Sequence, residues 1–509
     1  MNAPRQPLVE QAREAAECGE WQQAHGLLQD ADAGASLGVS DLALLADVAY
    51  AAGHLDVTLN TWERIHTQCI QEGDHLGAAR AAVRLAMHLL CDTSMMAPVR
   101  GWISRAERVL EGHGETPAHA WVAVLRGYDR LFLGDFQAAR EWARKAIDIG
   151  SRCEPAAAAM GRLTEARGLI LDGHVSQGLE LMNEAAVVTV SGELDPFMTG
   201  IVYCELICAM QALGQYDLAE QWTEAMDLWG REHAVGGIHG RCRVHKAEIL
   251  RLRGSCDEAE QEAIRACEEL RPFLRRELGW PLTELGRIRL NRGDLQGAED
   301  AFLAAHEAGW DPQPGLALVY LARGDIDLAG KFVQDALDHP LIIVSKEYPP
   351  NTALRRAPLL EALVRIKIAS GDLDPARGAA EELSRIAALF GSEALAASAA
   401  LGRGRVALAE SDPASAKRLF LEAARLWTGV GAPYETSVAR MALAHAYEAE
   451  GDDQRAAMEF RAARSGFEQA GAVHQAAEAA RACRGELHGE TPEAGGTSPE
   501  QPAAGTVGN

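Results

Sequence analysis

A short turn sequence that begins with glycine recurs along the whole chain and limits the folds open to it. The form Gly-Asp-x-x-x-Ala occurs five times, with its glycine at positions 134, 293, 324, 371 and 451. The fifth residue after each turn residue is small, and only Thr58 deviates slightly. Self-similarity at a fixed period indicates stacked supersecondary units. Looser versions of the turn begin at Gly19, Gly53, Gly173, Gly214, Gly254 and Ser411.

The spacing between turns gives the size and number of the units. Most successive turn residues lie 39 to 41 positions apart. The gap between positions 53 and 134 equals two periods, so a further turn is expected near residues 93–98. The shorter and longer gaps on either side of position 324 together span two more periods. The sequence therefore predicts about twelve units of about 40 residues each.

The turns and the segments between them favour helices. Glycine can adopt the left-handed conformation that ends a helix, and a following Asp can accept hydrogen bonds from the first amides of the next one. The small residue lets the second helix pack closely on the first. Apolar residues between turns recur at three- and four-residue spacing. The best strand candidate, residues 187–190, is short, and we expect it to be a helix end or linker. The chain is predicted to be all-α.

A solenoid grows lengthwise instead of dividing into globules. With 509 residues and 48% hydrophobic content, the chain has ample material for such a core. We expect a short N-terminal segment (1–10), a first solenoid section (11–310), a second section (311–485) and a disordered tail (486–509). Two irregular stretches, residues 311–315 and 347–351, mark the expected joint.

The charge pattern excludes several classes of partner. The net charge is −24, whereas nucleic-acid binding requires a clustered basic surface. The most basic cluster, residues 271–276, is short and is interpreted as a solvated helix face. We find no secretory signal and no stretch approaching the roughly 18 apolar residues of a membrane span. Ten cysteines without a CxxC pair fit reduced thiols in the cytoplasm. We therefore predict a cytoplasmic protein that contacts neither nucleic acid nor membrane.

Motifs for catalysis or metal binding are weak. The GxSxG pattern at residues 34–38 lacks the strand that a nucleophile elbow requires, and Gly324 to Lys331 only superficially resembles a phosphate loop. We expect Cys204 and Cys208, one helical turn apart, to be small core residues.

One constellation has to be weighed as a metal site. His239, Cys242 and His245 have a spacing that could direct two or three ligands at a metal, but zinc usually takes four in a closed structural site. Arg241 and Arg243 would also repel a cation. Packing or groove contact by His245 is the favoured interpretation, so no metal and no cofactor are predicted.

The repeats resemble tetratricopeptide (TPR) units in the turn glycine, the small residue and the places of Leu443 and Tyr447. More specifically, the chain is similar to the long C-terminal repeat region of large actinobacterial regulators of the LuxR/MalT class. The resemblance covers nearly all of residues 10–485 and implies a right-handed, TPR-like α-solenoid of about twelve helical hairpins. It is carried by residues 192–204, 242–254, 311–318 and 432–452.

The departures from that family restrict the function that the resemblance implies. Such regulators carry an ATP-binding module before the repeats and a helix-turn-helix after them, and neither is recognised in this sequence. The remaining part is the one that receives a ligand or an inhibitory protein. We therefore expect a non-enzymatic scaffold or sensor that binds a protein or small-molecule signal in bacterial regulation. One alternative is an orphan module that acts with separate ATPase or DNA-binding partners. The other is an enzyme with its site in the groove.

The first helix of each TPR-like unit lines the concave surface, which identifies candidate binding residues. Aromatic and Arg side chains in such a groove suit a peptide or an acidic, partly apolar ligand. Alternatively, the longer repeat shifts the register and buries several of these side chains. Counting back from the turns places these residues at or near the groove: Trp121, Tyr128, Cys204, Gln211, Arg241, His245, Arg251, Trp280 and Arg287.

Overall fold

The computed structural model describes residues 5–34, 36–93, 95–233, 236–271, 277–341 and 352–484, without the side chains of residues 5 and 232–239. These ranges contain 25 α-helices and no strand. The all-α prediction is therefore confirmed. Among the described helices, none combines the length and apolar character that crossing a bilayer requires.

Successive helices pair into twelve hairpins, and α25 follows alone. The hairpins of the first half are α1 (Arg5–Glu17) with α2 (Trp21–Gly34), α3 (Val39–Ala51) with α4 (Leu55–Glu72), α5 (His75–His88) with α6 (Met96–Leu110), α7 (Pro117–Phe132) with α8 (Phe136–Cys153), α9 (Pro155–Leu171) with α10 (Val175–Val190), and α11 (Pro196–Ala212) with α12 (Tyr216–His233).

The second half repeats the pattern. Its hairpins are α13 (Gly236–Leu252) with α14 (Cys256–Leu270), α15 (Gly279–Arg292) with α16 (Leu295–Glu307), α17 (Gly315–Ala322) with α18 (Ile326–Asp338), α19 (Ala353–Ala369) with α20 (Leu373–Phe390), α21 (Glu393–Ala409) with α22 (Pro413–Val430), and α23 (Pro433–Ala449) with α24 (Asp453–Gln469); α25 is Val473–Cys483. The predicted solenoid of about twelve hairpins is confirmed.

The turn chemistry follows the sequence pattern closely. All eleven predicted turn residues have positive φ, between 63° and 89°, and Ser411 is the only one that is not glycine. The side chain of Asp294 accepts a hydrogen bond from Gly297 N at 2.9 Å, which caps α16. Asp325 and Asp372 form no such cap, so the capping expected of the Asp holds in only part of the series. The missing turn lies where expected, after the π-helical segment η1 (Leu89–Thr93).

The small residue after each turn lies at the helix–helix contact. Ala139, Ala298 and Ala376 are fully buried. At Gly178 even one added carbon would lie 2.6 Å from Ile170 Cγ1 and 2.8 Å from Ala166 O. The two helices of each of these hairpins therefore approach closely beside the turn, as predicted.

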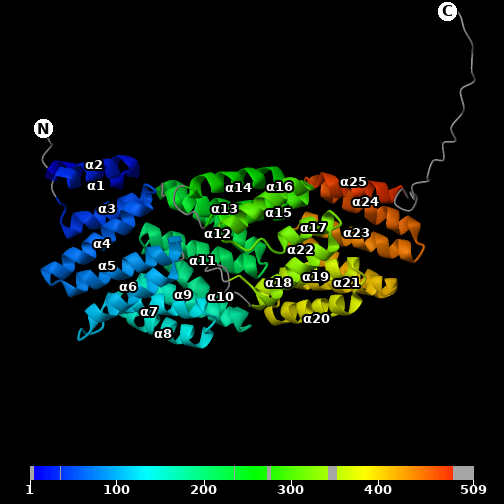
Figure 1. Cartoon of the computed structure of the whole chain (residues 1–509), viewed down its shortest axis with the longest axis horizontal. Coiled ribbons are helices and arrows are strands. Elements are labelled where there is room, and N and C mark those ends of the chain that lie inside the picture. Colours follow the sequence, from blue (N-terminus) through cyan, green and yellow to red (C-terminus); the bar gives the residue numbers. More distant parts are fainter. Residues whose placement is uncertain are drawn as a thin grey trace, which may run out of the picture.

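The solenoid coils tightly enough for distant hairpins to touch. Arg253 Nη1 donates to the carbonyl oxygens of Val430 and Gly431, at 2.7 and 3.2 Å. A carbon added at Gly293 would lie 2.5 Å from His474 Cβ. Figure 1 shows the resulting elongated body, in which α14 and α16 run toward α25 along one edge and α1 and α25 lie far apart. One main core cluster extends from Val9 to Val406.

The structure describes some, but not all, of the other segments that carry a sequence-based prediction. Residues 187–190 form the end of α10, as predicted. Of the expected irregular stretch 311–315, residues 311–314 lie in the segment 308–314 between α16 and the short α17, and Gly315 begins α17. The expected loop at 347–351 and the tail at 486–509 lie outside the described residues, as does most of the basic cluster 271–276. The division into sections at residue 311 stays a prediction.

Candidate functional site: the central cavity

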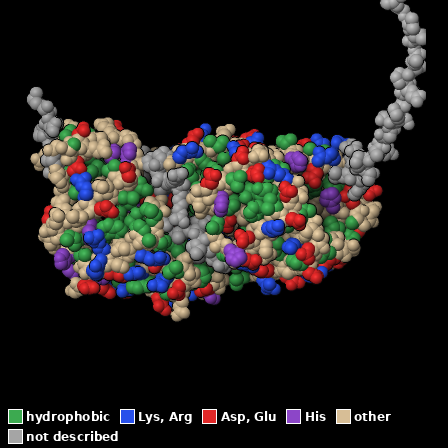
Figure 2. Space-filling model, viewed as in Figure 1, with side chains coloured by type: hydrophobic (Ala, Val, Ile, Leu, Met, Phe, Trp, Pro, Cys, Tyr) green, Lys and Arg blue, Asp and Glu red, His purple; other side chains and the backbone are tan. Residues whose placement is uncertain are grey.

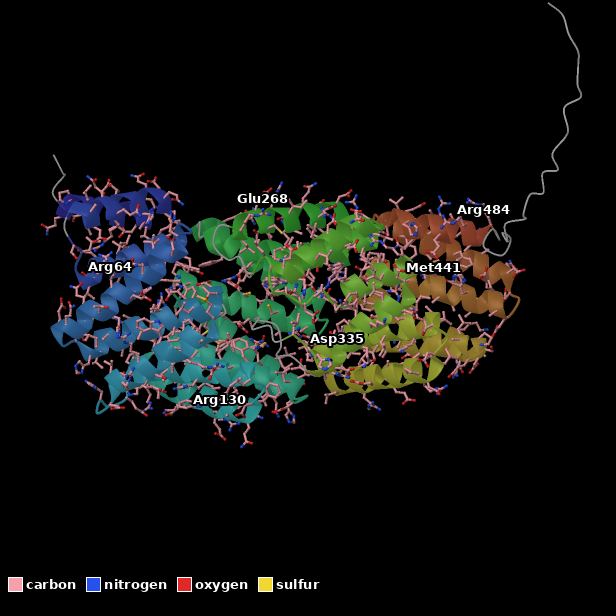
Figure 3. All side chains as sticks on the ribbon, in the orientation of Figure 1. Arg64, Arg130, Glu268, Asp335, Met441 and Arg484 are labelled. Carbon is pink, nitrogen blue, oxygen red and sulfur yellow. The ribbon has the colours of Figure 1, made fainter. Side chains whose placement is uncertain are left out.

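The inner faces of the first helices enclose one large cavity in the second half of the solenoid. Its volume is about 1350 Å³. Side chains fill most of the space between the ribbons (Figure 3), and the cavity is the volume that they leave between the coils. The odd-numbered helices from α11 to α25 supply most of its wall, with smaller contributions from their partners and the loops.

One register position recurs around this wall. The residue six positions before the turn residue lines the cavity in each of seven successive hairpins. The predicted inner face of the first helices is therefore the face that meets the cavity. The seven residues are Cys208, Glu248, Arg287, Leu318, Arg365, Arg405 and His445.

Four of the predicted groove residues line the cavity: Gln211, Arg251, Trp280 and Arg287. Arg251 donates to Glu284 at 2.5 Å and lies 3.9 Å from Glu435. The side chain of Arg287 is 43% exposed and lies 3.4 Å from the same Glu284. Arg287 thus keeps part of its side chain exposed at the cavity wall.

Arg241 does not lie on the concave surface where the sequence register places it. Its exposure is 2%. Its Nη2 donates to Asp92 Oδ1 and to the Cys91 carbonyl at 2.9 Å each, and Nε donates to Glu277 Oε2 at 2.9 Å. Burial acts to lower the pKa of Arg241, but Glu277 and Asp92 outweigh it and raise the pKa well above its usual value. The long side chain is covered because an earlier superhelical turn of the solenoid, here called a coil, packs against α13. The contacting residue Asp92 lies 149 positions before Arg241.

Four further predicted residues also lie outside the cavity lining, and one of them is the fully buried Cys204. Trp121 is half-buried on α7, and Tyr128 on the same helix is 3% exposed. His245 is fully buried, 3.4 Å from Cys204 and with its ring edge-on to Trp280. The alternative that the register buries several groove candidates therefore holds for four of them: Tyr128, Cys204, Arg241 and His245.

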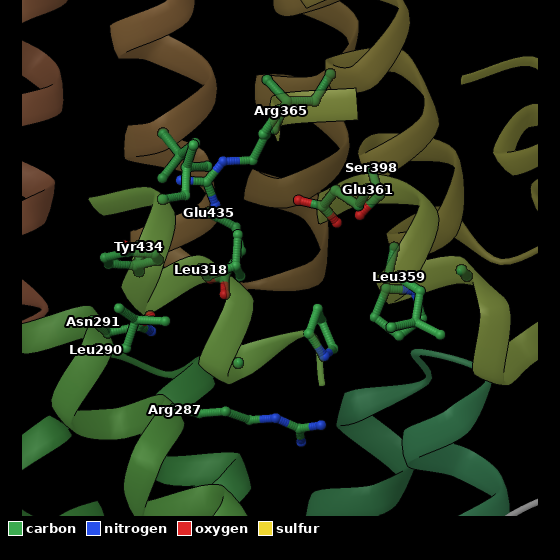
Figure 4. A pocket seen from close by; sticks show the side chains of 18 of the residues that line it. Arg287, Leu290, Asn291, Leu318, Leu359, Glu361, Arg365, Ser398, Tyr434 and Glu435 are labelled. Atoms are coloured by element: carbon green, nitrogen blue, oxygen red, sulfur yellow. The ribbon is translucent and has the colours of Figure 1, made fainter. Parts of the chain in front are cut away.

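The structure adds cavity residues that the sequence list omitted. Arg365 on α19 and Arg405 on α21 occupy the recurring register position, and the same count from Gly371 and Ser411 would have found them. Figure 4 shows Arg365, Tyr434 and Glu435 around one space. Neither arginine has an ion-pair partner among the described residues. Burial, together with nearby Arg365, lowers the pKa of Arg405 to about 10.

Several buried polar atoms on the cavity wall make no hydrogen bond to any described residue. Three are donors, on α11, α21 and α22, and two are acceptors, on α23 and α25. Burial also raises the pKa of Glu435, because a carboxylate is poorly solvated there. The atoms are Gln211 Nε2, Arg405 Nη1, Trp427 Nε1, Glu435 Oε2 and Gln475 Oε1.

The metal constellation considered from the sequence is not the one that the fold assembles. The side chain of His239 lies outside the described residues. The Cys242 thiol lies 3.9 Å from the Thr223 carbonyl. His245 instead joins Cys204 and Cys208, and in the described part of the chain these three form the one group with metal-ligand spacing.

The fold and cavity define a TPR-like α-solenoid with a partly open cavity on its inner surface. No protein-family model and no curated protein matches the sequence. The structure is similar to a chain in the crystal structure of the APC/C hetero-tetramer Cut9–Hcn1, with 13% identity, a TM-score of 0.39 and coverage of 94% of this chain and 96% of that one. A second match is BtubC (BKLC) from P. vanneervenii, with 20% identity, a TM-score of 0.28 and coverage of 51% and 98%. Matches this distant carry no argument about function.

Proposed function

We propose that the chain is a non-enzymatic scaffold that binds an extended segment of a protein partner in its central cavity. The unpaired polar atoms on the cavity wall carry the proposal. Buried polar groups in folded proteins are nearly always hydrogen-bonded, and leaving one unpaired costs about 1–3 kcal/mol. An extended peptide offers a donor and an acceptor at almost every residue, which matches a wall that displays both.

The size of the cavity favours a peptide over a small-molecule effector. Pockets for small molecules usually measure about 300–1,000 Å³, whereas this cavity measures about 1350 Å³. The wall is also contributed by successive hairpins, so that an extended segment can contact several of them at once.

The arginines indicate the character of the bound segment. Arg365 and Arg405 lack ion-pair partners among the described residues, and Arg287 keeps part of its guanidinium exposed. Arginine recognises carboxylates through paired hydrogen bonds. We therefore expect the segment to carry an acidic side chain or a C-terminal carboxylate opposite these residues. Over the face visible in Figure 2, acidic and basic side chains are interspersed.

A finer role in bacterial regulation is supported only by the sequence resemblance. In that hypothesis the solenoid is a cytoplasmic sensor, or a module that works with separate ATPase or DNA-binding proteins. Identification of the bound segment would decide between these roles.

The proposal is tested by selecting displayed random peptides on the full chain and measuring their affinity by fluorescence anisotropy. We expect acidic peptides to be selected. The double variant Arg365→Gln, Arg405→Gln should weaken binding at least tenfold, because each lost charged hydrogen bond contributes about 1.5–3 kcal/mol.

The matched control is Arg385→Gln, Arg425→Gln. These exposed arginines lie on α20 and α22, the second helices of the same two hairpins, and do not line the cavity. Their substitution should leave affinity unchanged. Equal affinity for both double variants, or failure to select any peptide, would contradict the proposal.

A further inference from the structure

Two thiols and an imidazole converge in the core beside the cavity. Cys204 and Cys208 lie one turn apart on α11, and His245 lies on α13. Their ligand atoms are all within 4.8 Å of one another, and all three residues are buried. An i, i+4 pair points from one face of a helix, so α11 presents both sulfur atoms toward α13. Three soft or borderline donors in this arrangement are a ligand set for zinc.

The imidazole is oriented for coordination through Nε2. Its Nδ1 lies 2.8 Å from Gln211 Oε1, an atom that only accepts hydrogen bonds. Nδ1 therefore carries the proton, and the lone pair of Nε2 is directed toward Cys204 Sγ at 3.4 Å. The imidazole and the Trp280 ring pack in a T-shaped arrangement, with centroids 4.7 Å apart. Fixing the tautomer through the second nitrogen is how proteins prepare a histidine for a metal.

The distances are close to those of a tetrahedral site. Zinc–sulfur and zinc–nitrogen bonds of about 2.3 and 2.0–2.1 Å separate neighbouring ligand atoms by roughly 3.5–3.8 Å. The Cys204–His245 distance of 3.4 Å is near that range. The other two pairs of ligand atoms, each within 4.8 Å, both include the Cys208 sulfur. Cys208 lines the cavity. A small rotation of that thiol would complete the three-ligand set.

Charge also favours a divalent ion. Two thiolates and one neutral imidazole cancel the charge of Zn²⁺, so the occupied site places no net charge in the core. With three protein ligands, the fourth position of the tetrahedron is left for water or a donor from another molecule.

We propose that Cys204, Cys208 and His245 bind one zinc ion, with the fourth coordination position open toward the central cavity. The inference goes beyond the proposed peptide binding and does not depend on it. Gln211 is a positioning residue, because it acts on the metal through His245.

The test uses the full chain with its thiols reduced, titrated with Co²⁺ as a spectroscopic probe and then with Zn²⁺ against a competing chelator. We expect one equivalent to bind, with the absorption of tetrahedral cobalt and a sulfur-to-cobalt charge-transfer band. Zn²⁺ should displace the cobalt. This measurement needs no substitution, so absence of the charge-transfer band in the unaltered chain would overturn the proposal even if variants fail to fold.

Variants then assign the ligands. Cys204→Ser and Cys208→Ser should each reduce the charge-transfer band, and Gln211→Leu should lower zinc affinity about 10–100-fold without removing a ligand. Cys267→Ser is the control, because this buried thiol on α14 lies outside the group. Equal loss in Cys267→Ser and Cys204→Ser would overturn the assignment.

Discussion

Side chains at one register position have different environments along the chain. Tyr128 and Arg287 both lie six residues before a turn glycine. Tyr128 is 3% exposed, whereas the side chain of Arg287 is 43% exposed. The first lies in the main core, and the second faces the cavity. The repeat therefore determines which way a side chain points, but the neighbouring coil determines what it meets.

Buried thiols give a prediction at the residue scale. Burial raises the pKa of Cys242 to about 12 and that of Cys256 to about 11. A thiol with a pKa near 11 is thiolate in about one molecule in 10³ at pH 8, and only the thiolate reacts. We expect iodoacetamide at pH 8 to label the exposed Cys18 and Cys153 well before these two, as followed by peptide mass spectrometry.

The pH dependence follows from the direction of these shifts. Because the pKa values are raised, the thiolate fraction of the buried cysteines should grow about tenfold for each pH unit up to their pKa. In denaturant, where burial is lost, all the thiols should react at similar rates. Native Cys256 labelled as rapidly as Cys18 would show that the region around α14 is open.

At the scale of the helical hairpin, the turn and the small residue act together. The positive φ of the turn residue reverses the chain, and the residue five positions later sets how closely the second helix approaches the first. Gly178 is one example, where an added carbon would meet Ala166 O and Ile170 on the opposing helix α9. Backbone atoms cannot move aside as a flexible side chain can, so this contact limits residue size.

Gly178→Ala should therefore destabilise the protein by about 1–3 kcal/mol through overpacking, despite the higher helix propensity of alanine. The control is Gly26→Ala on α2, where an added carbon meets nothing within 4 Å. That exposed substitution should stabilise by about 0.5–1 kcal/mol. Urea unfolding followed by circular dichroism measures the unfolding free energy of both variants. A stabilised Gly178→Ala variant would refute the explanation that close helix packing limits the size of residue 178.

At the scale of the whole molecule, ionic contacts join coils that are distant in sequence. Asp92 accepts from Arg241 and also lies 3.0 Å from His88 Nδ1, while Tyr50 donates to it at 3.3 Å. This network ties the second and third hairpins to the seventh. Because both charges are buried, removal of one partner leaves the other without compensation.

Arg241→Met should cost about 3–5 kcal/mol of unfolding free energy, because the buried Asp92 and the largely buried Glu277 would lose their shared cation. Arg231→Met removes an arginine whose side chain is 67% exposed in its pair with Asp227, and it should cost less than about 1 kcal/mol. Adding Asp92→Asn and Glu277→Gln to Arg241→Met should recover part of the loss. Similar unfolding free energies for Arg241→Met and Arg231→Met would argue against a role of Arg241 in holding distant hairpins together.

Local signals made most of the fold predictable. The turns at Gly134, Gly293 and Ser411 depend on residues that are adjacent in sequence, so helix ends and hairpin number could be read directly. The candidate site was predictable only in part. Arg251, Trp280 and Arg287 line the cavity, whereas Arg365 and Arg405 were left out although they share the register of Arg287.

The sequence by itself determined the helical hairpin, its period and the face that each first helix turns inward. Only the tertiary structure decided whether that face meets a cavity, as at Arg405, or another coil, as at Arg241. Cys204 and Cys208 are buried, as predicted for small core residues, and only the tertiary structure decided that they meet His245 there. The physical reason is that the shape of a solenoid accumulates from a small rotation at every repeat. No single repeat encodes that sum, so contacts between residues 100 or more positions apart emerge only when all the hairpins are stacked.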